Sequence, residues 1–158
     1  MIMNMAHRFL AIATALLLGL PAAAGGPILS VTHDGDVMKF DIAILQAMDT
    51  VEFETTTIWT EGVQSFSGVS LATLLNTLDV TEGTLKATAI NDYAVEIPVE
   101  DAVQGGPIIA YMRNGTPMSV RDKGPFWVVY PYDSDPSYQT EIIYSRSIWQ
   151  LDGIEVMD

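Results

Sequence analysis

The chain has 158 residues, a formal net charge of −13 and no cysteine. One domain accounts for that length, and so acidic a protein disfavours phosphate backbones and anionic lipid headgroups as partners. The lack of cysteine excludes a thiolate nucleophile, a cysteine-held metal and a c-type haem attachment.

The first 24 residues are typical of a secretory signal peptide. A short basic start precedes an apolar run at 9–20, which a proline and three alanines follow. That run is shorter than the roughly 20 residues that span a bilayer, and small residues at this distance favour cleavage. We therefore expect cleavage after Ala24 and export to the periplasm, leaving a single domain of residues 25–158. An uncleaved N-terminal anchor is the alternative.

The segment 28–78 carries strand and helix signals in turn. Asp34-Gly35 predicts a tight hairpin turn. Asp41 and Ser70 each precede apolar residues at helical spacing, so both are expected to cap a helix. In chain order we expect a strand at 28–33, a strand at 37–40, a helix at 41–48, a strand at 51–59 and a helix at 70–78.

The segment beyond residue 78 is typical of strands joined by short turns. Asn114-Gly115 is a strong hairpin signal, and the apolar run 126–131 indicates a buried strand. We expect strands at 85–91, 93–99, 107–113, 126–131 and 147–156, one helical turn near 100–103 and a loop at 133–137. This balance predicts an α+β fold, rich in strands, with two or three short helices.

The residues alone indicate neither a metal site nor a catalytic group. His33 is the one histidine beyond residue 24, and zinc sites need more nitrogen or sulfur ligands than that. The acidic loop of Asp133 and Asp135 is too short for a calcium loop, and Pro136 interrupts it. Nucleophile and phosphate-binding motifs are absent from the sequence, and no pair among the 20 acids stands out as an acid–base couple.

Two features do point to a binding site. Most of the aromatic residues in strand-like segments are expected in the core; these residues are Trp59, Trp127, Trp149, Tyr93, Tyr111 and Tyr130. Trp59 differs from the others because it lies in a polar run just before a turn. Arg113, Arg121 and Lys123 make up half of the six basic residues beyond residue 24. Such a local positive region favours either an anionic ligand or ion pairs with nearby acids.

Five segments in order give the chain a resemblance to a known family. They are FDIAILQAM, TTTIWTEGVQSFSGVSLATLL, AINDYAVEIPVEDA, IIAYMRNGTPMSVRDKGPFWVVYPYD and SIWQLDGIEV. Together they resemble the oxidoreductase molybdopterin-binding domain, the sulfite-oxidase-like fold, and in particular its small secreted bacterial members. The resemblance implies a β-rich mixed sandwich or barrel. In the full-length enzymes it also implies a molybdenum–pterin cofactor with oxygen-atom or reductive chemistry.

The chain departs from that family where the chemistry would be. The family enzymes hold molybdenum through a cysteine near the end of the strand expected here at 51–59, and this chain offers Thr56, Thr57, Ile58 and Trp59 instead. A threonine hydroxyl stays protonated near neutral pH and is a poor substitute for a soft sulfur ligand. The family's histidine before the Gly-Pro turn is Lys123 here, and the arginine after that turn is replaced.

We therefore expect a non-catalytic periplasmic domain that keeps the fold and its cleft, without a cofactor. The alternatives are an oxidoreductase that binds molybdopterin without a cysteine ligand and an assembly protein with no small ligand. The resemblance implies a cleft between 57–59, 91–93 and 121–125. Tryptophans would form its flat walls and basic residues its rim, to suit a small anionic or aromatic ligand or a periplasmic protein partner. The candidate binding residues are Trp59, Asn91, Tyr93, Arg113, Arg121, Lys123 and Trp127.

Overall fold

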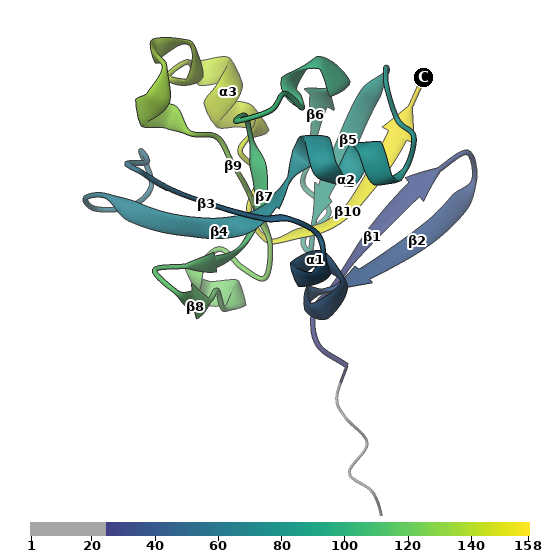
Figure 1. The fold of residues 1–158 in the computed structure, drawn as a ribbon, viewed down its shortest axis with the longest axis horizontal. Helices are drawn as coiled ribbons and strands as arrows, with labels where there is room; N and C mark the ends of the chain where they lie inside the picture. Colours follow the sequence, from purple (N-terminus) through teal and green to yellow (C-terminus); the bar gives the residue numbers. More distant parts are fainter. Residues whose placement is uncertain (1–24) are drawn as a thin grey trace, which may run out of the picture.

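Two open β-sheets form the fold, and short helices pack against them (Figure 1). The computed structural model describes residues 25–158, so the expected signal peptide at 1–24 lies outside the described residues. The first sheet has the order β2-β1-β10-β5-β6, in which β1 runs parallel to β10 and every other pair is antiparallel. Its strands are β1 (Ile28–His33), β2 (Asp36–Asp41), β5 (Thr84–Ala89), β6 (Ala94–Pro98) and β10 (Leu151–Met157).

The second sheet is antiparallel throughout. It has the order β3-β4-β7, and both β8 and β9 pair with the remaining edge of β7. Figure 1 shows its long strands β3 and β4 extending away from the first sheet. Its strands are β3 (Thr50–Thr55), β4 (Gln64–Ser70), β7 (Ile108–Arg113), β8 (Thr116–Pro117) and β9 (Trp127–Val129).

The segment that precedes β10 joins the two sheets. Trp149 forms an isolated antiparallel bridge with Trp127 of β9. The backbone N–H of Val128 donates to the carbonyl oxygen of Ile148 at 2.9 Å, and that of Leu151 donates to Phe126 at 2.9 Å. The chain then enters the first sheet as β10. Trp149 is thereby fixed at the junction of the sheets.

The helices are short, and side chains cap them at the expected positions. Asp41 accepts a hydrogen bond from the N–H of Ile44 at 2.8 Å, and Ser70 accepts one from the N–H of Thr73 at 2.9 Å. Both expected caps are therefore confirmed. The α-helices are α1 (Ile42–Ala47), α2 (Leu71–Thr77) and α3 (Glu141–Arg146), and the 3₁₀ turns are η1 (Val99–Asp101), η2 (Val120–Asp122), η3 (Tyr132–Ser134) and η4 (Pro136–Tyr138).

One apolar core lies between the sheets and beneath the helices. Phe66, Leu74, Ile109 and Trp127 are fully buried within it, each from a different element. Burial of large side chains on this scale supplies the main favourable term in folding. None of the helices within residues 25–158 is long and apolar enough to cross a bilayer.

The mixed α+β, strand-rich class is confirmed, with differences in detail. The expected strand at 51–59 ends at Thr55, because the next residues turn through side-chain hydrogen bonds. β4 was not expected, since only Phe66 and Val69 of its seven residues are large and apolar. α3 was not expected either, and the last strand begins at Leu151 rather than at residue 147.

Candidate ligand pocket

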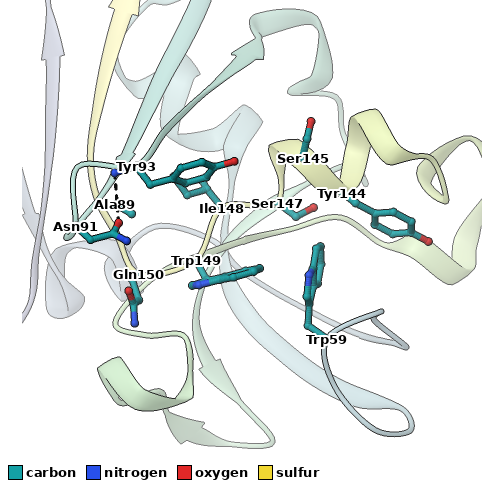
Figure 2. A pocket seen from close by; sticks show the side chains of 10 residues that line it. All are labelled: Trp59, Ala89, Asn91, Tyr93, Tyr144, Ser145, Ser147, Ile148, Trp149 and Gln150. Carbon is teal, nitrogen blue, oxygen red and sulfur yellow. Dashed lines mark hydrogen bonds between the residues drawn. The ribbon is translucent and has the colours of Figure 1, made fainter.

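A pocket of about 350 Å³ opens beside the junction of the two sheets (Figure 2). Three parts of the chain contribute to it: the loop after β3, the turn between β5 and β6, and the stretch from α3 to β10. Four of its side chains are aromatic. The lining residues are Trp59, Ala89, Asn91, Tyr93, Tyr144, Ser145, Ser147, Ile148, Trp149 and Gln150.

Trp59 is held by its loop and by other rings. The hydroxyl of Thr57 accepts hydrogen bonds from the backbone N–H groups of Trp59 at 3.1 Å and Thr60 at 3.0 Å, which tightens the turn. The Trp59 indole then meets four neighbouring rings edge to face, at centroid distances between 5.4 and 6.2 Å. Edge-to-face contacts are a favourable arrangement of aromatic pairs, so the orientation of Trp59 is strongly constrained.

The turn between β5 and β6 presents Asn91 and Tyr93. The N–H of Ala89 donates to the carbonyl oxygen of Tyr93 at 2.8 Å, and the N–H of Ile90 donates to Gln150 at 2.9 Å. The second bond ties this turn to the stretch before β10. Tyr93 remains 58% exposed, so it forms the outer edge of the pocket.

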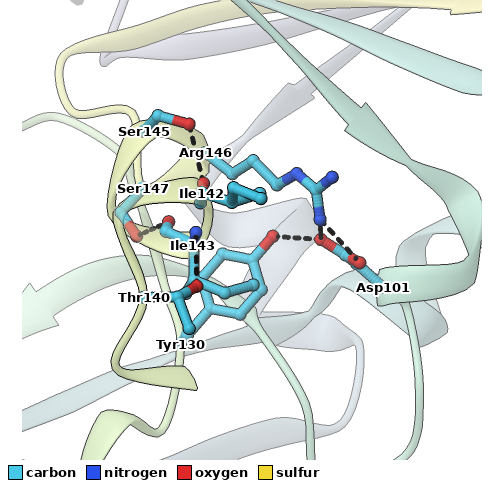
Figure 3. Close-up of polar contacts among 8 residues, drawn as sticks. All are labelled: Asp101, Tyr130, Thr140, Ile142, Ile143, Ser145, Arg146 and Ser147. Atoms are coloured by element: carbon cyan, nitrogen blue, oxygen red, sulfur yellow. Dashed lines mark hydrogen bonds and ion pairs between the residues drawn. The ribbon is translucent and has the colours of Figure 1, made fainter. Parts of the chain in front are cut away.

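α3 carries the opposite side of the pocket, and an ion pair fixes its C-terminal end (Figure 3). Nη1 of Arg146 lies 2.9 Å from Oδ2 of Asp101 in η1, and the hydroxyl of Tyr130 donates to the same oxygen at 2.7 Å. Burial, followed by the hydrogen bond to Asp101, raises the pKa of Tyr130. Tyr130 therefore stays a neutral donor to the carboxylate.

Three hydrogen bonds hold Ser147, the residue that directly follows α3. Its hydroxyl donates to the carbonyl oxygen of Ile143 at 2.8 Å and accepts from the hydroxyl of Tyr132 at 2.7 Å. Its own carbonyl oxygen accepts from Nε1 of Trp127 at 3.2 Å. Burial raises the pKa of Tyr132, which keeps that hydroxyl a donor. The backbone that leads to Trp149 is thus held on both sides.

The pocket lining has no carboxylate, imidazole, ammonium or guanidinium group. Its polar groups are the amides of Asn91 and Gln150, the serine hydroxyls and the tyrosine hydroxyls. Outside the lining, Nζ of Lys123 stands 4.2 Å from the centroid of the Trp149 ring and 5.7 Å from that of Trp127. These distances are typical of cation–π contacts.

The structure brings together some of the residues proposed from the sequence. Trp59, Asn91 and Tyr93 line the pocket. Trp127 does not form an open wall, because it is fully buried beneath Trp59 and Trp149. It packs there against Phe66 with ring centroids 5.3 Å apart.

The proposed basic rim does not surround this pocket. Arg113 lies at the end of β7 and Arg121 is exposed on η2, and neither they nor Lys123 line the cavity. Their alternative role as surface ion pairs is not seen either, since among residues 25–158 no carboxylate oxygen lies within 4.0 Å of a charged nitrogen of these three side chains.

The sequence did not indicate the stretch of chain that contributes most of the pocket. Tyr144, Ser145, Ile148, Trp149 and Gln150 belong to α3 and the chain that follows it. Helix signals were present: Thr140 caps α3 by accepting from the N–H of Ile143 at 3.3 Å, and acidic Glu141 and basic Arg146 occupy its first and last turns. Its apolar residues Ile142, Ile143 and Tyr144 are consecutive rather than at helical spacing, so the periodicity signal is missing.

The threonines after β3 form internal hydrogen bonds. The N–H and hydroxyl of Thr56 donate to the two carboxylate oxygens of Asp133 at 2.6 and 2.7 Å. The hydroxyl of Thr57 is engaged with Thr60 at 2.8 Å. Among residues 25–158, no three or more histidine, cysteine or acidic side chains are grouped so as to hold a metal ion.

Comparison of the chain with models of protein families and with curated proteins finds no match.

Proposed function

We propose that the protein is an exported, non-catalytic binding domain that holds a small, largely apolar ligand in the pocket between Trp59, Tyr93 and Trp149. The observation that carries this proposal is the lining itself: four aromatic rings, a few neutral polar groups, and no carboxylate, imidazole, ammonium or guanidinium group. Concave sites with apolar walls and a few placed polar groups are the usual form of small-molecule sites. Its volume of about 350 Å³ is at the lower end of their range.

The lack of a carboxylate, imidazole or amine base in the lining favours binding over turnover. General acid–base and nucleophilic mechanisms need a titratable or activated group within hydrogen-bond reach of the ligand. Here the serine hydroxyl of Ser147 already bonds Ile143 and Tyr132, and that of Ser145 donates to the carbonyl oxygen of Ile142 at 2.7 Å. No base contacts either serine in the described residues.

We further propose that the domain has the sulfite-oxidase type of molybdopterin-binding fold, as its five sequence segments suggest. The two strand-rich sheets with few helices, and a pocket beside the loop after β3, support this proposal. The residues present do not fit the family's cofactor. The chain has no cysteine, the hydroxyls of Thr56 and Thr57 are engaged in hydrogen bonds, and no basic side chain lines the pocket to meet a cofactor phosphate.

The experiment is a thermal-unfolding screen of the purified protein against small neutral and charged aromatic and aliphatic compounds. A compound that binds the folded state at 100 times its Kd adds about 2.7 kcal/mol to the free energy of unfolding. The best compound is then compared in Tyr93→Ala and Ile58→Ala. Both side chains are about 60% exposed, at 58% and 61%, but only Tyr93 lines the pocket.

The expected result is that Tyr93→Ala loses most of the ligand-induced stabilisation and Ile58→Ala retains it. Equal stabilisation of both variants would place the ligand elsewhere. A screen in which no compound stabilises the protein would favour the assembly role without a small ligand.

A further inference from the structure

We propose that the ligand of this pocket is a small quaternary ammonium cation. This inference rests on the proposed binding function and adds the chemical class of the ligand. It comes from the angles between the aromatic walls, the hydrogen-bonding groups of the lining and the charge of the surrounding protein.

The aromatic walls meet at steep angles. The rings of Trp59 and Trp149 have centroids 5.4 Å apart and an interplanar angle of 70°, and those of Trp59 and Tyr144 an angle of 86°. Figure 2 shows the Tyr93 ring across the space from the Trp149 indole, with Trp59 to one side. A flat ligand stacks best between parallel faces, whereas rings set around a space at steep angles suit a rounded cation that several π-faces attract.

The polar groups of the lining favour a cation without N–H donors. A primary ammonium carries three donors, and a buried donor without an acceptor is costly. No carboxylate lines the pocket, and the acceptors that the lining offers are neutral amide and hydroxyl oxygens, which compensate an ammonium charge less well. A quaternary ammonium group has no such donors, so aromatic faces alone can replace its water. An anion would find neither an ammonium nor a guanidinium in the lining.

The negative charge of the surrounding protein favours a cationic ligand. Residues 25–158 carry all 20 acidic residues and six of the seven basic ones, so their formal charge is −14. A negative surface raises the local concentration and the association rate of cations. One cation already uses an aromatic face here, because Nζ of Lys123 lies 4.2 Å from the Trp149 centroid. Lys123 lies outside the lining, so a bound ligand would share this indole with it.

The test compares choline with its neutral carbon isostere, 3,3-dimethylbutan-1-ol, by NMR titration of the indole N–H signals of the purified protein. The two probes have nearly the same shape and differ in charge. We expect choline to bind at least tenfold more tightly, and we expect Tyr93→Ala to reduce that preference. Raising the salt concentration should weaken the binding of choline and leave the binding of the isostere unchanged, because screening acts on the charged probe alone.

Two charge variants test whether the effect of a positive charge depends on its position beside Trp149. Lys123→Gln and Arg121→Gln each remove one positive charge, but only Lys123 stands over Trp149. Because its ammonium competes for the same indole and repels a second cation, Lys123→Gln should raise choline affinity several-fold more than Arg121→Gln. Neither substitution should change the affinity for the isostere.

The outcomes separate this inference from the proposed function. If the isostere binds as tightly as choline at the pocket signals, the inference is wrong and the binding function stands. If neither probe binds but indole perturbs the same signals, the inference is again wrong and the binding function again stands. If choline, the isostere and indole all leave these signals unchanged, both proposals fail.

Discussion

The carboxylate of Asp101 and the guanidinium of Arg146 form an ion pair that joins η1 to α3, with Nη1 2.9 Å from Oδ2 and 3.1 Å from Oδ1. Their side chains are only 17% and 24% exposed. Arg146 lies between Ser145 and Ser147, which both line the pocket. The pair therefore fixes the part of the chain that leads to Trp149.

Replacing Arg146 by methionine should lower the free energy of unfolding by about 1.5–3 kcal/mol, because it leaves a half-buried carboxylate without its charged partner. Urea unfolding measures this. The control is Lys86→Met, whose pair with Glu155 is 3.8 Å long and about half exposed on both sides. That variant should change the free energy by less than about 1 kcal/mol. Equal losses in the two variants would contradict the role assigned to Arg146.

The second prediction concerns pH. The backbone N–H of Thr56, followed by its hydroxyl, lowers the pKa of Asp133 below the usual value of 3.8. A lowered folded-state pKa means that the ionised carboxylate stabilises the folded state above about pH 4 and that this contribution disappears as the pH falls through the folded-state value. Thr56→Val should raise the pKa of Asp133 toward 3.8, as followed by NMR titration of its carboxyl carbon.

A second check is to unfold the wild-type protein and the Asp133→Asn variant at a series of pH values. The difference in stability between wild type and Asp133→Asn should be largest near neutral pH and should narrow below pH 3.8. A difference that stays constant from pH 7 to pH 2 would show that the hydrogen bonds from Thr56 do not depend on the charge of Asp133.

Local signals in the sequence predict most of the elements, because caps and turns act over four residues. Asp41 and Ser70 cap the helices expected of them, and Asn114-Gly115 turns with positive φ values of 52° and 73° between β7 and β8. β4 could not be predicted from local signals, because its small residues are required by the close approach of the neighbouring strands. A Cβ atom on Gly68 would lie 2.1 Å from the carbonyl oxygen of Ile109 in β7.

The pocket is harder to predict, because it depends on long-range contacts. Trp59 stands out in its polar run, yet its partners Trp149 and Tyr144 lie more than eighty residues further along the chain. Trp127 and Trp149 both fall in segments expected to be strands, but only the first is fully buried. The bridge between them at the sheet junction joins residues 22 positions apart, a contact that local sequence signals do not indicate.

The third prediction concerns export. Residues 1–24 have the order of a basic start, an apolar run and small residues. Protein recovered from the periplasm of its own host should therefore begin at Gly25 or within two residues of it. N-terminal sequencing checks this, and a soluble cytoplasmic form that retains Met1 would contradict it.

The fourth prediction concerns metal content. Without a thiolate, and with His33 as the one histidine beyond residue 24, the protein purified from its own host should contain well below one molybdenum or zinc atom per chain. Plasma mass spectrometry measures the metal, and pterin fluorescence reports the organic part of the cofactor. Stoichiometric molybdenum together with a pterin signal would support the oxidoreductase alternative instead.

The most direct test of the central claim is a fragment titration of the ¹⁵N-labelled protein, followed by amide and indole N–H signals. If the pocket is the binding site, fragments that bind should perturb the indole signals of Trp59 and Trp149 and the amides of 89–93 and 144–150. The groove beside α2 serves as the internal comparison, since it has a similar volume of about 330 Å³ but no aromatic residue in its lining. Perturbations confined to that groove, or absent from both sites, would contradict the account.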